Sequence, residues 1–401
     1  MSKHQQSLID TGWMLLESAK TPMHLGCLLI FKNTAKGEAR DGQLTLPMHE
    51  WEACELRPPW NCRIRESLTR NLTPSLEVCP ETTLDNHFHR IALPKPGGDK
   101  ELGMTVSRLH SNALDTSSPP WECYVLEGLH GQQFAVYLKI HPVLAVRLGG
   151  LDFMERWLSN RRNNQFGPPP WSIKSIEPAS SATAQNLGHI FRNQQSTVNA
   201  VLKGCRSLAK AAISNRRQLT VPYTAPKTVL NANISSQRRF ATQQYSVSVL
   251  NKIVKRLNVD ITTVILFMLG SALRRFLMEY NALPDEPLLA SIPLAMGEGY
   301  KEKALAEALS PVTISLGSQY ADVGKRLEAI EHSLEAARQQ VISLPEDART
   351  SYSMALAIPF IAGQLTGTSQ WLPTLSNLNV TTLQGPETQR YCGHFSLEAA
   401  Y

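Results

Sequence analysis

Two adjacent runs of strand-forming residues constrain the fold of this 401-residue chain more than any other feature. Residues 121–129 and 133–141 are rich in aromatic and branched apolar side chains, and a short segment that contains a glycine separates them. This pattern predicts a β-hairpin. Leu144, Leu148 and Met154 follow at helical spacing, so a helix should begin just after the second strand. Strands and helices that alternate in this way predict a mixed α/β (α+β) fold.

The length of the chain predicts two domains, because one domain usually holds roughly 100–200 residues. A Pro-rich stretch followed by a Ser/Ala-rich one marks the expected boundary at residues 167–184. We therefore predict an N-terminal domain over residues 1–180, a basic linker with a helix over residues 181–230, and a C-terminal domain over residues 231–401.

The C-terminal part repeats the mixture of helical and strand-like patterns. Helical patterns cover residues 247–257, 262–280 and 323–340, and the strand-like strings LLASIPLAM and VTISLG lie between the second and the third. This part should therefore also contain a sheet with flanking helices.

Charge is distributed unevenly along the chain. Twelve Lys or Arg residues and no Asp or Glu occur from Pro178 through Val259, although the formal net charge of the whole chain is only +6. Such a segment implies an anionic partner. For residues 184–217 two interpretations stand: an amphipathic helix on anionic lipid or a lipid inclusion, and a solvated linker helix. Nucleic acid is not expected, because no recognisable nucleic-acid module accompanies the charge.

The sequence shows no targeting or membrane-spanning signal. The first residues have no apolar core of the kind found in signal peptides. The most apolar run, residues 264–277, is short for a membrane span and contains Arg274 and Arg275. We therefore expect a cytoplasmic protein, either soluble or peripheral on the inner membrane face or on lipid inclusions.

Cysteine usage agrees with a reducing compartment. The seven cysteines are odd in number and form no C-x-x-C pair, which is typical of free thiols. His87 and His89 stand without cysteine or carboxylate neighbours at ligand spacing, so no metal site is expected.

Several strings resemble signatures of one protein family, and they occur in its order and with its spacing. They resemble the bacterial wax ester synthase/diacylglycerol acyltransferase family over nearly the whole chain. The strings are TPMHLG at 21–26, residues 92–129, RRFA at 238–241, SALRRFL at 271–277 and residues 350–367.

This resemblance implies two halves of the chloramphenicol-acetyltransferase type, each a mixed sheet with flanking helices, which meet along a tunnel. It implies acyl transfer from acyl-CoA to a long-chain alcohol or diacylglycerol, giving wax esters or triacylglycerol. No cofactor is expected, since acyl-CoA is a substrate. The family's motif is His-His-x-x-x-Asp-Gly, in which the second His is the general base that removes the alcohol proton.

The aligned string of this chain departs from that motif at three of four positions. The first His is retained, and the catalytic His, the Asp and the Gly are replaced. In motif order the four residues are His141, Pro142, Val146 and Arg147. His141 is therefore the only candidate catalytic residue of the motif.

Two further signatures of the family are altered. Thr262–Thr263 replaces an Asn-Asp pair at the head of a helix, and residues 382–385 replace an Asn-Val-Pro-Gly turn. The chain also ends at Tyr401, where relatives continue, so the C-terminal half is expected to be truncated or the sequence to be partial.

Each motif position has a functional and a structural interpretation. His141 is either a substitute base or a buried histidine at the end of a central strand. Pro142 suits the first turn of a helix, so replacing the catalytic His by proline would impair catalysis without disturbing the fold. Arg147 either binds a CoA phosphate or is not a ligand. Two functions follow: an acyltransferase impaired by loss of its base, and a non-catalytic acyl-CoA- or lipid-binding pseudoenzyme or inert remnant.

Overall fold

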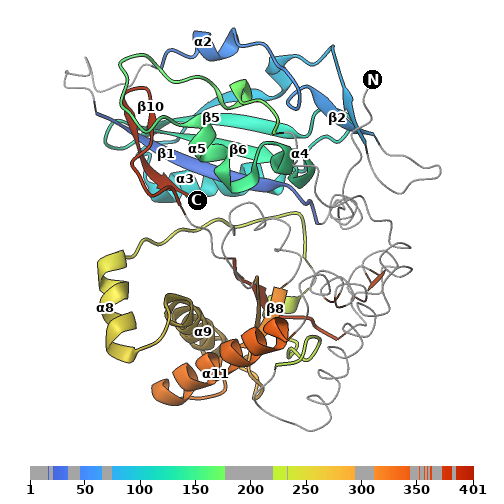
Figure 1. Cartoon of the computed structure of the whole chain (residues 1–401), viewed down its shortest axis with the longest axis vertical. Helices are drawn as coiled ribbons and strands as arrows, with labels where there is room; N and C mark the ends of the chain where they lie inside the picture. The colour runs from blue at the N-terminus through green and yellow to red at the C-terminus, as the bar shows by residue number, and fades with distance from the viewer. Residues whose placement is uncertain are drawn as a thin grey trace. The chain divides into compact units, whose positions relative to one another are not determined.

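The computed structural model divides the chain into two compact units (Figure 1). The first comprises residues 1–184, 234–242 and 383–401, and the second comprises residues 185–233 and 243–382. The structure describes residue 17, residues 21–34, 46–65, 75–176, 220–232, 234–293, 311–343, 373–381 and 385–401, and five single positions between 352 and 363.

A six-stranded mixed sheet forms the centre of the first unit. Its order is β10-β11-β1-β6-β5-β4, and every neighbouring pair is antiparallel except β4 and β5. The predicted hairpin is confirmed, since β5 pairs with β6 from Trp121 opposite Ile140. The strands are β1 (Leu25–Asn33), β4 (Phe88–Ala92), β5 (Trp121–Leu129), β6 (Gln133–Ile140), β10 (Tyr391–Cys392) and β11 (Phe395–Ala400).

The two faces of this sheet are covered by different helices, as the alternation along β6 requires. Phe134, Val136 and Leu138 belong to a core that also contains buried residues of the helices on one side, whereas Ala135 and Tyr137 pack with those of a single helix on the other. The first side has α2 (His49–Glu52), α4 (Pro142–Arg147) and α5 (Phe153–Trp157), and the second has α3 (Asp99–Ser111).

The remaining elements of the first unit are short. A separate two-stranded antiparallel ribbon joins β2 and β3. The bounds are β2 (Cys62–Arg65), β3 (Ser75–Val78), η2 (Leu84–Asn86), η3 (Gly150–Asp152) and η4 (Pro170–Ser172).

The last strands of the chain belong to the first unit, which corrects the predicted domain boundaries. β11 pairs with β1, and its Phe395 is buried and packs edge-on against Phe134. The side chains of the first unit against which this ring packs remove it from water, so assigning all of residues 231–401 to the C-terminal half is wrong for this segment. Residues 234–242 also belong to the first unit, whereas residues 220–232 of the predicted linker contact the second through a bridge from Ala225 to Thr374.

The second unit contains a smaller mixed sheet in the order β8-β7-β9, with β7 antiparallel to β8 and parallel to β9. Its core joins buried residues of these strands with those of α9 and α11. The three predicted helices and both strand-like strings are confirmed. The bounds are η5 (Val229–Asn231), α8 (Val247–Leu257), α9 (Ile261–Glu279), β7 (Leu289–Pro293), β8 (Pro311–Ser315), α11 (Val323–Ile342) and β9 (Leu378–Asn379).

Helix α9 is the one helix of the described residues that is long and apolar enough to cross a membrane. It is also a packed helix of the second unit, because Leu266 and Leu277 are fully buried in the core with β7, β8 and α11. Its first turn is capped by Asp260, which accepts a hydrogen bond from the Thr263 N–H at 2.7 Å and pairs with Arg338 at 2.6 Å. Length and composition alone therefore do not identify α9 as a span.

Candidate functional site

His141 lies between a central strand and the helix that follows it. It comes directly after β6, is fully buried, and caps α4. Its Nδ1 accepts a hydrogen bond from the Val143 N–H at 3.2 Å. Because a neutral imidazole has one protonated nitrogen and one acceptor, this contact places the proton on Nε2. The only ring nitrogen with a lone pair is thus already in use.

The Nε2 atom of His141 faces the carboxylate of Glu17. The distance from Nε2 to Oε2 is 3.3 Å, an ion-pair contact that falls short of good hydrogen-bond geometry. Burial alone would raise the pKa of Glu17, but the contacts with His141, the Met23 backbone and the nearby His24 outweigh it, so the pKa lies below its usual 4.5. Glu17 is therefore a carboxylate at neutral pH beside two histidines.

The other motif positions lie on α4. Pro142 is buried at the first position of the helix, where its missing N–H removes no helical hydrogen bond. Val146 is exposed. Arg147 is half-buried, its carbonyl accepts from the Ile176 N–H at 2.8 Å, and its guanidinium has no ion-pair partner among the described residues. None of these three side chains supplies a proton acceptor.

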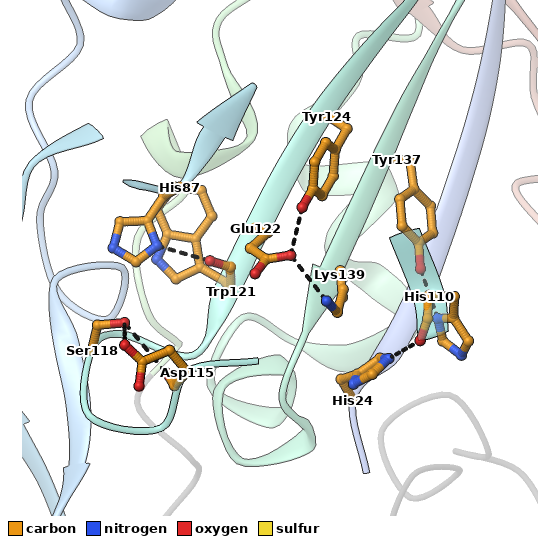
Figure 2. A network of polar contacts seen from close by, with 10 residues as sticks. All are labelled: His24, His87, His110, Asp115, Ser118, Trp121, Glu122, Tyr124, Tyr137 and Lys139. Carbon is orange, nitrogen blue, oxygen red and sulfur yellow. Dashed lines mark hydrogen bonds and ion pairs between the residues drawn. The ribbon is translucent and has the colours of Figure 1, made fainter. Parts of the chain in front are cut away.

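A polar network lies next to this motif on the face of the sheet that α3 covers (Figure 2). Glu122 on β5 accepts hydrogen bonds from the Tyr124 hydroxyl at 2.7 Å and from Nζ of Lys139 on β6 at 3.0 Å. The strand register places Glu122 opposite Lys139 and Tyr124 opposite Tyr137, so all four share one face. Lys139 is completely buried, and its charge is compensated by Glu122.

A second chain of contacts joins β1, α3 and β6 on the same face. His24 donates from Nε2 to the carbonyl of His110 at 2.8 Å, and Nδ1 of His110 lies 2.7 Å from the Tyr137 hydroxyl (Figure 2). Burial lowers the pKa of His24 to about 4, against the contribution of the His110 carbonyl, so the ring is neutral at pH 7. Its Nδ1 is buried without a hydrogen-bond partner in the described part of the chain.

The amino end of β5 is fixed by a third group of contacts, also drawn in Figure 2. Nδ1 of His87 lies 2.8 Å from the carbonyl of Trp121, and its ring stacks on the indole at 4.7 Å. In the preceding loop, the carboxylate of Asp115 accepts from the Ser118 hydroxyl at 3.4 Å, as Figure 2 shows. It also accepts from the hydroxyl and backbone N–H of Ser117, which the figure does not draw, and these bonds lower the pKa of the carboxyl. These groups hold the strand that carries Glu122.

Sequence reasoning found the position of His141 but missed the residues around it. No pattern in the sequence indicates Glu17, and His24 is indicated only as part of the string TPMHLG. Lys139 lies in a strand whose apolar pattern gave no sign of a buried ammonium. The predicted hairpin could have indicated this ion pair, because the pairing of its two strands places Lys139 opposite Glu122.

The other altered signatures are only partly described. Thr263 is buried in the first turn of α9, and its hydroxyl lies 3.0 Å from Oδ1 of Asp260, which caps this helix. Residues 382–384 lie outside the described residues, as does the basic segment 184–217.

Two cysteines and the possible metal ligands among the described residues are the further candidates for a second site. Burial raises the pKa of the Cys27 and Cys392 thiols to about 12, so neither is a nucleophile at neutral pH. Across the described ranges, no group of three or more His, Cys, Asp or Glu side chains could hold a metal ion.

Comparison with known proteins gives a consistent family assignment. Residues 7–265 match the model of the wax ester synthase/diacylglycerol acyltransferase catalytic domain. The chain is 33% identical to a putative diacylglycerol O-acyltransferase of Mycobacterium tuberculosis, covering 98% of the chain and 86% of that protein. It is 28% identical to the O-acyltransferase WSD of Acinetobacter baylyi, covering 98% and 85%.

Solved structures agree with this assignment. A wax ester synthase/diacylglycerol acyltransferase from Marinobacter aquaeolei superposes with a TM-score of 0.74 at 26% identity, covering 99% of this chain and 86% of that one. The first condensation domain of the calcium-dependent antibiotic synthetase superposes with a TM-score of 0.50 at 11% identity, covering 100% and 84%. The second likeness shows the fold alone, and together they confirm the predicted fold class.

Proposed function

Because this chain belongs to the wax ester synthase/diacylglycerol acyltransferase family, we propose that it binds acyl-CoA and a long-chain alcohol or diacylglycerol but transfers the acyl group at or near the background rate. The family supplies the reaction and the substrate classes. The residues of this chain supply the reason for the impairment.

The state of the motif carries the proposal. An alcohol attacks a thioester efficiently only if a group within hydrogen-bond reach removes its proton, and such a base contributes roughly 10²–10⁴ in rate. By the resemblance of the string that contains His141 to the family's motif, the position of that base is occupied here by Pro142, which is the first residue of α4. The neighbouring His141 does not replace it, because its Nδ1 accepts from the Val143 N–H and its Nε2 faces Glu17. The lone pair on Nδ1 is therefore already used by the backbone and does not reach an incoming alcohol.

The second candidate function differs from an impaired acyltransferase in turnover alone: it is a pseudoenzyme that binds acyl-CoA or lipid and has no acyl-transfer activity at all. Three of the four motif residues are replaced, whereas the core around them is closely packed, with Leu144 and Leu148 of the motif region fully buried. A retained scaffold with lost polar residues favours a protein that still binds acyl-CoA or lipid. An inert remnant would show neither turnover nor binding.

We also propose that the protein is cytoplasmic and associates with anionic lipid surfaces through the basic part of the chain between Pro178 and Val259. Attraction between exposed charges is screened over about 10 Å at 0.1 M salt. Binding to anionic vesicles should therefore fall steeply with added salt.

The experiment that tests acyl transfer measures two quantities on the purified protein. Turnover is followed with labelled palmitoyl-CoA against hexadecanol and diacylglycerol, and acyl-CoA binding is measured by calorimetry. We expect binding together with turnover at or near background. A substantial rate that His141→Ala abolishes without unfolding the protein would make His141 the base. A rate that His141→Ala leaves intact would overturn our assignment of the motif.

A further inference from the structure

Helix α8 presents an apolar stripe to solvent. None of its eleven residues is buried. Val249, Ile253 and Leu257 are exposed by 53%, 36% and 48%. They follow one another at intervals of four residues, so they form a line along the helix within an arc of about 80°. An apolar line of this kind on a surface helix is unusual unless another surface covers it.

The polar side of α8 carries only positive charge. Lys252, Lys255 and Arg256 are all exposed, and the helix contains no acidic residue. At about 100° per residue, Arg256 and Lys252 border the stripe on the side of Val249. The helix therefore places basic groups beside apolar ones, which is the arrangement of helices that lie in a lipid interface.

The remaining apolar residues of α8 attach it to its own unit. Leu250 and Val254 are half-buried, and α8 packs against α9. Asn258 ends the helix in the left-handed conformation, and its N–H donates to the carbonyl of Val254. The packing against α9 thus holds α8 in place, and no other described residue covers the stripe of Val249, Ile253 and Leu257.

The residues around α8 in the sequence indicate that its partner carries negative charge. No Asp or Glu precedes the helix as far back as Pro178, and the first acidic residue after it is Asp260. Tyr245, two residues before the helix, is 58% exposed, and tyrosine is enriched where apolar and aqueous regions meet. An anionic partner with an apolar interior fits both features.

We propose that α8 docks the second unit onto an anionic lipid surface. Val249, Ile253 and Leu257 insert between acyl chains, and Lys252 and Arg256 contact lipid phosphates. This inference deepens the proposed lipid association and names its contact surface. It does not depend on acyl transfer.

The test compares a stripe variant with a matched control by flotation with vesicles that mix phosphatidylglycerol and phosphatidylcholine. The stripe variant carries Ile253→Gln and Leu257→Gln, and the control carries Val323→Gln and Ile342→Gln at exposed positions of α11. Losing the transfer of two apolar side chains should weaken binding at least roughly tenfold. The control should bind like the unchanged protein, and circular dichroism should show all three folded.

Two further experiments identify which residues of α8 touch the lipid. Tryptophan introduced as Ile253→Trp should be quenched by brominated lipid beyond the native signal, whereas Lys255→Trp on the far side of the helix should add little. Lys252→Gln with Arg256→Gln should weaken binding to phosphatidylglycerol vesicles, and pure phosphatidylcholine should not distinguish this variant from the unchanged protein.

Three results would overturn the inference. Undiminished binding by the stripe variant would exclude α8 as the contact. If Arg206→Gln with Lys210→Gln abolished binding while the α8 variants kept it, lipid association would stand but its surface would lie in residues 184–217. If the stripe variant altered the mass measured by light scattering without changing vesicle binding, the stripe would be an interface between copies of this chain.

Discussion

At the scale of single residues, both ring nitrogens of His141 face groups of the protein itself. His141 caps a helix with one nitrogen and faces a carboxylate with the other. A general base needs a lone pair directed at its substrate, and the only lone pair of this ring accepts from the backbone. Proline at the next position then starts the helix without disturbing it. The substitution is mild for the fold and severe for the chemistry.

The neutral, buried His24 should make the protein sensitive to acid. Its pKa is about 4 in the folded state against a usual 6.5, so between these values the unfolded chain binds a proton that the folded chain does not. The free energy of unfolding should therefore decrease as the pH falls from about 6.5 to about 4, with roughly 1–3 kcal/mol due to this residue.

The measurement is urea denaturation across this pH range for the unchanged protein and for His24→Gln, which keeps an N–H donor for the His110 carbonyl. The variant should lose less stability on acidification. His49→Gln, on the exposed side of α2, is the control and should keep the full dependence. Parallel pH curves for His24→Gln and the unchanged protein would show that His24 titrates normally.

At the scale of elements, β5 and β6 are joined by a buried ion pair. Removing one partner of such a pair leaves an uncompensated charge and costs about 3–5 kcal/mol, whereas replacing both by apolar groups is often nearly neutral. Glu122→Leu should therefore destabilise the protein strongly, because Lys139 is completely buried.

The double variant Glu122→Leu with Lys139→Met should recover much of that loss, as measured by denaturation of all three proteins. A double variant less stable than Glu122→Leu alone would show that the network on the α3 face, including Tyr124, depends on Lys139 for more than charge compensation.

The pairing of β11 with β1 gives a second prediction for the elements. Phe395 is 1% exposed and touches Phe134 and Phe166, so Phe395→Ala should lower the free energy of unfolding by about 3–5 kcal/mol. The half-buried Leu397 on the same strand is the comparison, and Leu397→Ala should cost clearly less. Equal small effects in thermal denaturation would mean that the C-terminal strand adds little to the first unit.

Local patterns predicted the hairpin and the helices, because strand alternation and helical spacing act over a few residues. They could not predict that β11 completes the N-terminal sheet, since the partners Phe31 and Leu397 lie far apart in the sequence. The same limit applies to the site. The motif indicates His141. Its contact with Glu17 joins residues that are more than 120 positions apart in the sequence, and no local pattern predicts such a contact.

At the scale of the whole molecule, the chain keeps the fold of an acyltransferase family, and our proposal is that its motif lacks the proton acceptor. Two units with separate mixed sheets are present, and the family match extends over most of the chain. Substrate binding depends on the scaffold and catalysis on a few polar residues. This protein should therefore keep substrate binding and lose most of its catalysis, so that acyl-CoA is bound and little product is formed.

The most direct test of this claim restores the motif and measures the rate of ester formation from palmitoyl-CoA and hexadecanol. The unchanged protein and Pro142→Ala should remain at background, and Pro142→His alone should recover little, because Val146 and Arg147 still replace the Asp and the Gly. Pro142→His with Val146→Asp and Arg147→Gly should give a clearly higher rate, since a correctly positioned base contributes roughly 10²–10⁴ and the restored Asp and Gly should allow that positioning. An unchanged protein that already turns over rapidly, with Pro142→Ala equally active, would contradict the account.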